Sequence, residues 1–150
     1  MINIRTKGAS GELEICRILE PIVRGVLAEC GKELPVQAII QRNQNQSAVG
    51  GSDLTNTFGL CIEVKRQEQL AINDWWKQCV EAAVRNNEIP VLLYRQNQRK
   101  WQAVMLTDLF YGETGDRIKV RATIAIEDFL DFFRRHVMQC MIDGTYNLRI

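Results

Sequence analysis

The sequence predicts an α/β protein in which helices flank a central mixed β-sheet, and three observations support this fold class. Leu60–Arg66 reads LCIEVKR, where apolar and polar residues alternate as in a strand with one covered face. Residues 90–94, PVLLY, are almost wholly apolar, which is typical of a central strand covered on both faces. Longer segments with apolar residues at three- and four-residue steps lie before, between and after the strands, and this spacing indicates helices.

The first helix is expected to begin near Ala9 or Ser10 and to end at Gly31, because glycine favours the helix C-terminus. Pro21 falls inside the apolar stripe, so we expect a kink or a division into two helices there. Residues 36–42 are then expected to form a strand.

After this strand the sequence predicts a loop at residues 47–52, with two adjacent glycines, and a short strand at residues 53–56. A turn leads from there into the strand at Leu60–Arg66.

The second half of the chain is expected to begin with a helix at residues 72–85. A polar turn at residues 96–100 joins the apolar strand to another at residues 101–106. A short edge strand at residues 117–121 and an amphipathic helix at residues 126–141 complete the chain. At 150 residues, the whole sequence (1–150) fits a single domain.

Composition narrows the class of protein. A hydrophobic fraction of 46% and a charged fraction of 25% are ordinary for a globular protein. The formal net charge is +1, so a polyanionic partner would need basic residues gathered on one face. Five cysteines without a C-x-x-C pair argue against zinc ribbons and thioredoxin-like motifs, and favour buried free thiols in a reducing compartment. With no apolar signal segment or membrane span in the sequence, we expect a cytoplasmic protein, in the host cytoplasm if it is viral.

The residues that indicate chemistry are Asp53, Glu63 and Lys65. Asp53 and Glu63 lie on consecutive expected strands, so their carboxylates can meet, and Lys65 shares a strand face with Glu63. Paired carboxylates, backbone carbonyls and waters form the oxygen ligand set that Mg²⁺ requires. A lysine beside them can orient water and stabilise charge as a phosphodiester is cleaved. An E-x-K triplet alone is also common on solvated strand faces, but here a glycine-rich loop and an acid precede it.

The pattern of Ser52-Asp53 followed by Glu63-Val64-Lys65 resembles the PD-(D/E)XK nuclease superfamily. Residues 7–12, KGASGE, resemble the K-G-x-x-x-E helix opening of archaeal-type Holliday-junction resolvases. Residues 60–65 resemble their catalytic strand, and residues 89–92 with Trp101 resemble their later strand pair. The resemblance covers residues 5–106 as a core and leaves residues 107–150 as a C-terminal extension with an extra strand and helix.

The resemblance implies a restriction-endonuclease-like fold and an Mg²⁺-dependent endodeoxyribonuclease, with Mn²⁺ able to substitute. The implied substrate is a four-way junction or other branched DNA, cut by a homodimer in recombination or repair. The implied catalytic residues are Glu12, Asp53, Glu63 and Lys65. The implied metal ligands are Asp53, Glu63 and the Val64 carbonyl, with Glu12 bound directly or through water.

Four further residues are candidates for DNA contacts. Arg5, Lys7 and Arg66 flank the implied site in sequence, although any of them is equally compatible with solvated surface. Ser47 is the possible counterpart of the serine in the flexible loop of the resolvases.

Several other side chains have both a functional and a structural interpretation. Gln78 is compatible with the helix-borne glutamine of some superfamily branches. His136, the only histidine, is expected to be structural, which disfavours histidine-based catalysis. Of Trp75 and Trp76, one is expected in the core and the other at an interface, and stacking on an unpaired base is the alternative. The dimer interface is expected to involve Trp76, Phe129, Phe132 and Phe133.

Two other functions stay open at this point. One is a different PD-(D/E)XK activity, such as a repair or restriction-like nuclease acting on duplex or single strands. The other is a nucleic-acid-binding module that keeps the fold without cleaving, which the intact acid, acid and lysine set disfavours.

Overall fold

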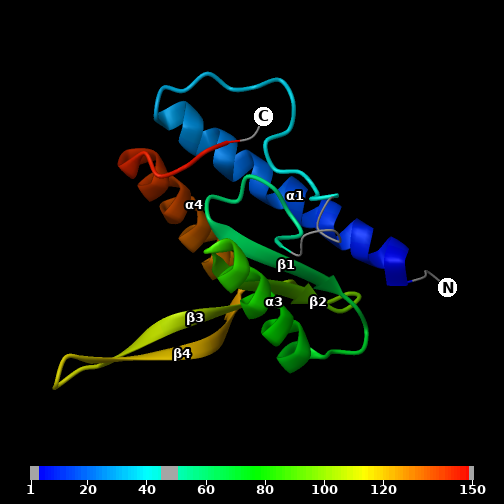
Figure 1. Cartoon of the computed structure of the whole chain (residues 1–150), viewed down its shortest axis with the longest axis vertical. Helices are drawn as coiled ribbons and strands as arrows, with labels where there is room; N and C mark the ends of the chain where they lie inside the picture. The colour runs from blue at the N-terminus through cyan, green and yellow to red at the C-terminus, as the bar shows by residue number, and fades with distance from the viewer. Residues whose placement is uncertain (1–3, 45–50, 149–150) are drawn as a thin grey trace.

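The computed structural model describes residues 4–44 and 51–148, with side chains from residue 7 onward. Its strands form one mixed sheet in the order β1-β2-β3-β4, with β1 parallel to β2 and the other neighbours antiparallel. The expected mixed sheet flanked by helices is confirmed. The elements are α1 (Ile4–Glu29), β1 (Leu60–Arg66), α3 (Ile72–Asn86), β2 (Ile89–Arg95), β3 (Gln102–Tyr111), β4 (Asp116–Ala125) and α4 (Ile126–Asp143) (Figure 1).

Helices cover both faces of the sheet. Helices α1 and α4 pack side by side on one face, where Leu60, Ile62 and Val64 of β1 join the larger core cluster. Helix α3 covers the other face, where Trp75 packs with Leu92, Tyr94 and Val104. The expectations for β1, β2, α3 and α4 are therefore confirmed, because each has the apolar pattern that its covered faces require. None of the described helices is long and apolar enough to cross a membrane.

Helix α1 differs from expectation in two ways. It includes residues from Ile4 onward rather than beginning near Ala9, and it runs through Pro21 without dividing. Pro21 and Arg17, whose carbonyl loses its usual N–H partner, both lie on the exposed side. Burial of the opposite side, including Leu19 and Val23, keeps the helix on the core. The expected end is confirmed, since Gly31 has a positive φ of 72°.

The expected strand at residues 36–42 is wrong, and so is the short strand at residues 53–56. The only strand-type pairing between these described segments is an isolated antiparallel bridge between Arg42 and Leu54. Val36 is fully exposed, whereas the adjacent Ile39 and Ile40 are both buried, so no alternation exists. The N–H groups of both isoleucines donate to the Glu20 carboxylate instead of a neighbouring strand.

The C-terminal part contains a much longer hairpin than expected. Strand β3 extends to Tyr111 rather than residue 106, and β4 spans Asp116–Ala125 rather than residues 117–121. Ten consecutive residue pairs join the two strands. Gly115, with a φ of 74°, donates its N–H to the Tyr111 carbonyl and closes the turn. The outer half of this hairpin projects from the body of the molecule (Figure 1).

The aromatic residues expected at a dimer interface are largely internal. Phe129 and Phe133 are completely buried in the core beneath α4, and Phe132 is half-buried against it. Trp76 is half-buried beside the α3 cluster, while Trp75 is buried as one of the pair was expected to be. The excess of aromatic side chains inferred from the sequence is thus wrong, because the core beneath α4 buries Phe129 and Phe133 completely and Phe132 in part. All five cysteines are free, as expected.

Candidate active site

Strand β1 carries a polar face directed toward α3. Glu63 and Lys65 share this face with Cys61, which packs on Ala82 and Ala83 of α3. The Glu63 Oε1 and Lys65 Nζ atoms lie 3.3 Å apart, and both side chains are partly exposed. The expected pairing of these two residues is therefore present in the structure.

Asp53 reaches Glu63 through the outer edge of β1. Its N–H donates to the Ile62 carbonyl at 2.8 Å, and its Oδ2 accepts the Val64 N–H at 2.7 Å. The Ser52 hydroxyl accepts the Ile62 N–H at 3.0 Å. Backbone bonds thus hold the Asp53 carboxylate beside the residue that follows Glu63. Its position depends on main-chain geometry more than on a free side-chain rotamer.

Glu12 approaches the same place from α1. Its side chain is almost fully buried, and its Oε2 accepts the Arg42 Nε–H at 2.6 Å. Arg42 is one-third exposed at the edge of the site. A buried carboxylate needs such a partner, because desolvation of an unpaired charge is costly.

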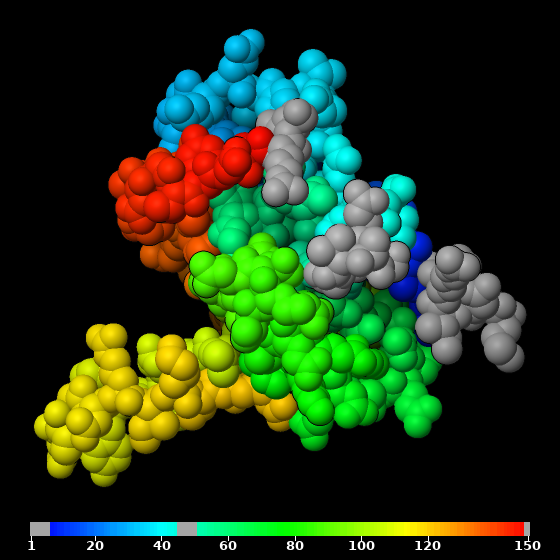
Figure 2. All heavy atoms as spheres, in the orientation of Figure 1, coloured from blue at the N-terminus to red at the C-terminus, as the bar shows by residue number. Residues whose placement is uncertain are grey.

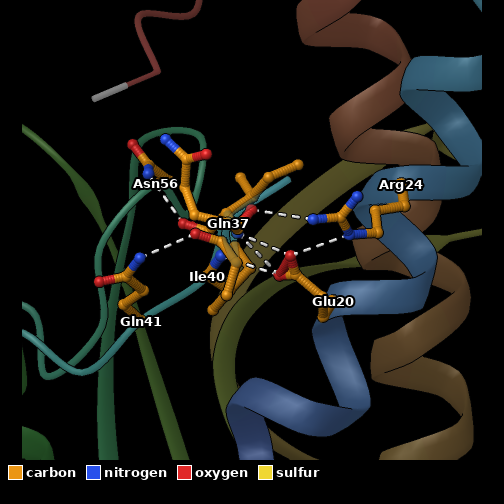
Figure 3. A network of polar contacts seen from close by, with 8 residues as sticks. Glu20, Arg24, Gln37, Ile40, Gln41 and Asn56 are labelled. Carbon is orange, nitrogen blue, oxygen red and sulfur yellow. Dashed lines mark hydrogen bonds and ion pairs between the residues drawn. The ribbon is translucent and has the colours of Figure 1, made fainter. Parts of the chain in front are cut away.

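The segment that bears Arg42 is fastened to α1 through Glu20 (Figure 3). The Glu20 carboxylate accepts the N–H groups of Ile39 and Ile40 and pairs with Arg24 at 3.3 Å. Arg24 in turn donates to the Gln37 carbonyl at 2.9 Å. This network fixes the turn immediately before Arg42 and so sets where its guanidinium lies.

These groups line one open cavity of about 770 Å³. Its floor is the polar face of β1, one wall is the first half of α1, and the other wall is α3. The cavity brings together all four residues that the family resemblance implied. The charged side chains that line it are Glu12, Arg42, Asp53, Glu63, Lys65, Arg66 and Arg85.

Burial raises the pKa values of the two central acids. Burial first, and then the Glu63 charge, raises the pKa of Asp53 to about 8, against the lowering effect of the Val64 N–H. Burial also raises the pKa of Glu63, although Lys65 opposes this shift. A cation placed between these carboxylates would remove both penalties, so the donor set suits a hard divalent ion.

The cluster is a two-carboxylate site rather than a full protein cage. Among the described residues, no three His, Cys, Asp or Glu side chains converge closely enough to hold a metal ion together. Asp53 and Glu63 can act as a pair, while Glu12 is engaged by Arg42. Mg²⁺ tolerates this arrangement well, since it usually keeps several waters and one or two carboxylates.

The remaining candidate residues lie at different distances from the cavity. Arg66 lines it and donates to the Ser10 hydroxyl at 3.0 Å. Lys7 lies one turn of α1 before Gly11 and pairs with Glu68 at 3.1 Å. Arg5 belongs to α1, but its side chain is outside the described part, and Ser47 lies outside the described residues altogether.

Two residues that were weighed as alternatives have clear positions. Gln78 lines the cavity from α3, where a helix-borne glutamine would be expected. His136 does not line it: its Nε2 lies 2.7 Å from the Phe58 carbonyl and its ring stacks on Phe132. The structural interpretation of His136 is confirmed.

Comparison with known families decides the affiliation. The family model described as “Phage putative PDDEXK endonuclease” matches residues 3–143. The chain belongs to this family. The matched range includes the β3–β4 hairpin and α4. The family match supports a nuclease activity for this protein.

No curated protein matches the sequence of this chain. Among solved structures, the chain is similar to Archaeoglobus fulgidus Hjc, a Holliday junction resolvase from an archaeal hyperthermophile, with 18% identity and a TM-score of 0.38. That alignment covers 75% of this chain and 98% of Hjc.

Arg42 and Arg85 are the charged cavity residues that sequence reasoning missed. Arg42 is thirty positions from its partner Glu12, and no motif links the two. Arg85 lies on α3 among ordinary surface charges. Arg85 follows Gln78 by seven residues, or about two helical turns, so both lie on the same face of the helix. This spacing is the only sequence signal that could have placed Arg85 on the cavity side.

Proposed function

We propose that this PDDEXK endonuclease is an Mg²⁺-dependent, structure-selective DNA endonuclease whose substrate is a four-way junction or other branched DNA. The observation that carries the proposal is the meeting of Asp53, Glu63 and Lys65 in one open cavity. Buried acids with raised pKa values, next to a lysine, form a site suited to binding a divalent cation and a phosphodiester.

Each residue has an assigned role. Asp53, Glu63 and the Val64 carbonyl would hold the ion, with Glu12 acting through water, and Mn²⁺ should substitute for Mg²⁺. The bound ion supplies a more acidic water and neutralises charge on the scissile phosphate. Lys65 orients the attacking water and stabilises the charge that develops on phosphorus-bound oxygens.

The cavity rim supplies the DNA contacts in this proposal. Arg66 lies on the rim and Lys7 near it, and each has an exposed or half-exposed neighbour rather than a buried one. Both can exchange that neighbour for a DNA phosphate. We assign Arg5 and Ser47 to the same contacts from the sequence resemblance.

The choice of branched DNA rests on the sequence motifs. Residues 7–12 and the strand at residues 60–65 resemble the helix opening and the catalytic strand of archaeal-type junction resolvases. A four-way junction is cut at two symmetry-related phosphates, so we propose a homodimer with one site per subunit. The five free thiols support a reducing compartment, and we propose the cytoplasm. We also propose that residues 1–150 form a single domain.

A cleavage assay tests the proposal directly. Four-way junction, flap, linear duplex and single-stranded DNA of matched sequence are incubated with the protein and Mg²⁺, Mn²⁺, Ca²⁺ or EDTA. We expect Mg²⁺-dependent paired nicks in the junction and much slower cleavage of the linear forms. Equal rates on all four would replace junction selectivity by a general nuclease activity. Binding without cleavage under every condition would leave a DNA-binding module.

A further inference from the structure

The outer half of the β3–β4 hairpin, residues 106–121, is exposed almost throughout. Every residue in it except the half-buried Val120 is exposed. Figures 1 and 2 show the two strands leaving the body of the molecule with open space on both sides. The inner half, which includes Ala103 and Met105, lies in the core. The fold therefore anchors this arm firmly at its base and leaves its outer half bare.

The register defines an apolar face on the arm. Ala103 and its partner Ile124 face the α1–α4 core, so the pairs four, six and eight steps farther out face the same way. These pairs bring together Leu109 and Ile118, each 57% exposed, with Tyr111, 62% exposed, at the tip. We call this set the arm's apolar face: Thr107, Leu109, Tyr111, Ile118 and Val120.

Such an arm is costly for an isolated chain. A two-stranded ribbon alone is marginally stable in water, and here it exposes large apolar side chains. No described segment pairs with the outer edge of β4, which contains no proline and no break in its ladder. Edges of this kind pair readily with other chains, so monomeric proteins usually shorten or block them.

The charges on the arm favour a protein partner over DNA. Residues 106–121 contain three basic residues, Arg117, Lys119 and Arg121, and three acidic ones. Asp108 pairs with Lys119 at 3.6 Å, so part of the basic charge is already neutralised. The register places all three basic residues on the opposite face of the arm, so the apolar face offers no positive charge to DNA and can instead complement the same face of a second copy.

The direction of the arm also favours a second copy. Strand β3 runs antiparallel to β2 and their pairing ends at Leu92 and Val104, so the arm extends past the N-terminal end of β2. Glu63 and Lys65 lie at and beyond the level of Leu92, toward the opposite end of the parallel pair. DNA seated over the cavity would therefore leave the arm's apolar face uncovered.

We propose that residues 106–121 form a self-association arm, whose apolar face docks against the same face of a second copy about a two-fold axis. This inference rests on the proposed function only in that it supplies the dimer needed for two symmetric cuts. The five residues of the apolar face are fewer than the roughly 20–30 residues per side of a standard interface, so the adjoining surface of the body also contributes to the contact. Leu109 and Ile118 are at the centre of the contact.

The experiment removes the arm at a point that the register defines. Leu106 and Arg121 are direct partners, so residues 107–120 are replaced by Asn-Gly, which forms a two-residue hairpin turn. A second variant, Leu109→Ser with Ile118→Ser, keeps the backbone. Glu113→Ser, in the exposed turn, is the control. Sedimentation equilibrium gives the mass, and circular dichroism checks that each variant is folded.

We expect dimers at micromolar concentration for the original protein and for Glu113→Ser. Both arm variants should be monomers, with a dissociation constant raised at least about 100-fold, as loss of an interface core predicts. A monomeric original protein at 100-fold higher concentration, or an arm-deleted protein that stays dimeric, would overturn the inference. If the deletion does not fold, the double serine variant decides.

The Mg²⁺-dependent cleavage of a four-way junction by the same samples separates this inference from the proposed function. Monomeric arm variants that still nick, but no longer make paired cuts, would support both. A dimer that cleaves no DNA would overturn the nuclease proposal and leave the arm intact. A monomer that cleaves branched DNA would support the nuclease proposal and overturn the inference about the arm.

Discussion

The two outer edges of the sheet differ in whether another part of the described chain covers them. At the β1 edge, Ser52 and Asp53 bind the backbone of Ile62 and Val64, so the unpaired peptide groups there are covered by the chain itself. At the β4 edge, no described segment pairs with the strand. An edge that is closed from within can hold a carboxylate at a fixed place, while an edge left open can receive another chain.

The closed edge shows how a buried acid can be positioned without a long side chain. Asp53 sits between two backbone bonds to β1, one through its N–H and one through its carboxylate. The same bonds that complete the sheet therefore bring two carboxylates together, at the cost of desolvating both. The predictions below test how far activity and stability depend on this edge.

The largest effect is expected from Glu63→Gln at the closed edge. Removing one of the two carboxylates should lower cleavage of branched DNA by about 1000-fold or more, because the ion loses a charged ligand. DNA binding should persist, since phosphate contacts supply most of the affinity. Gel-based cleavage and filter binding measure the two properties. The control is Glu127→Gln, an exposed acid that pairs with Lys100 far from the cavity in sequence. Full activity of Glu63→Gln would refute the site.

A smaller loss of activity is expected from Lys65→Ala. The ammonium lies 3.3 Å from Glu63 and faces the cavity, so its removal should lower kcat by about 100-fold through lost charge stabilisation in the transition state. KM for the junction should change little. Steady-state kinetics resolve the two constants, with the exposed Lys77→Ala of α3 as the control. A change confined to KM would assign Lys65 to DNA binding.

Asp53→Asn should change how stability depends on pH. The folded-state pKa of Asp53 is about 8 and its ordinary value is 3.8, so the folded protein favours the protonated form. This contribution is complete below pH 4 and is lost as pH rises toward 8. In metal-free buffer, the melting temperature of the asparagine variant should therefore gain on the original protein across this interval.

The same pair of proteins tests the ion. Mg²⁺ at pH 8 should raise the melting temperature of the original protein and have little effect on Asp53→Asn. Asparagine keeps an oxygen that can accept the Val64 N–H, so the edge itself should stay closed. If the melting temperatures of the two proteins change in parallel between pH 4 and pH 8, Asp53 does not contribute to the pH dependence of stability, and this prediction is wrong.

The smallest effect is expected from Ser52→Ala, which opens one contact at the closed edge. The buried hydroxyl accepts the N–H groups of Ile62 and Leu54, and its loss should cost about 1–3 kcal/mol of unfolding free energy. Urea denaturation measures the change. Thr55→Ala removes a hydroxyl bond to the Gln41 carbonyl at an exposed site and should cost less than about 1 kcal/mol. Equal losses in both variants would mean that the two hydroxyl bonds matter alike.

The sequence predicts the parts of this molecule that depend on local pattern. Strand β1, with Ile62 and Val64 inward and Glu63 and Lys65 outward, follows from alternation alone. The family resemblance, rather than local pattern, predicted that Glu12 would line the same cavity as Asp53. Their roles in catalysis stay predictions that the variants above examine.

Features that depend on distant partners could not be predicted in this way. The segment before Arg42 looked like a strand because Ile39 and Ile40 are β-branched. Its N–H groups instead bind a carboxylate from α1, about twenty residues away in sequence. The outer hairpin was underestimated for another reason. Beyond Leu106 both faces are exposed, so the apolar alternation that marks a half-buried strand is diluted by polar residues.

Four residues beside the closed edge form a neck that holds Asp53 from the side opposite β1: Arg42, Asn43, Ser52 and Leu54. Arg42 bridges Leu54, the Asn43 N–H donates to the Asp53 carbonyl, and its side-chain amide donates to the Ser52 carbonyl. Asp53 is therefore clamped by main-chain bonds on two sides, one set from the neck and one from β1. A change in either set would move the carboxylate relative to Glu63.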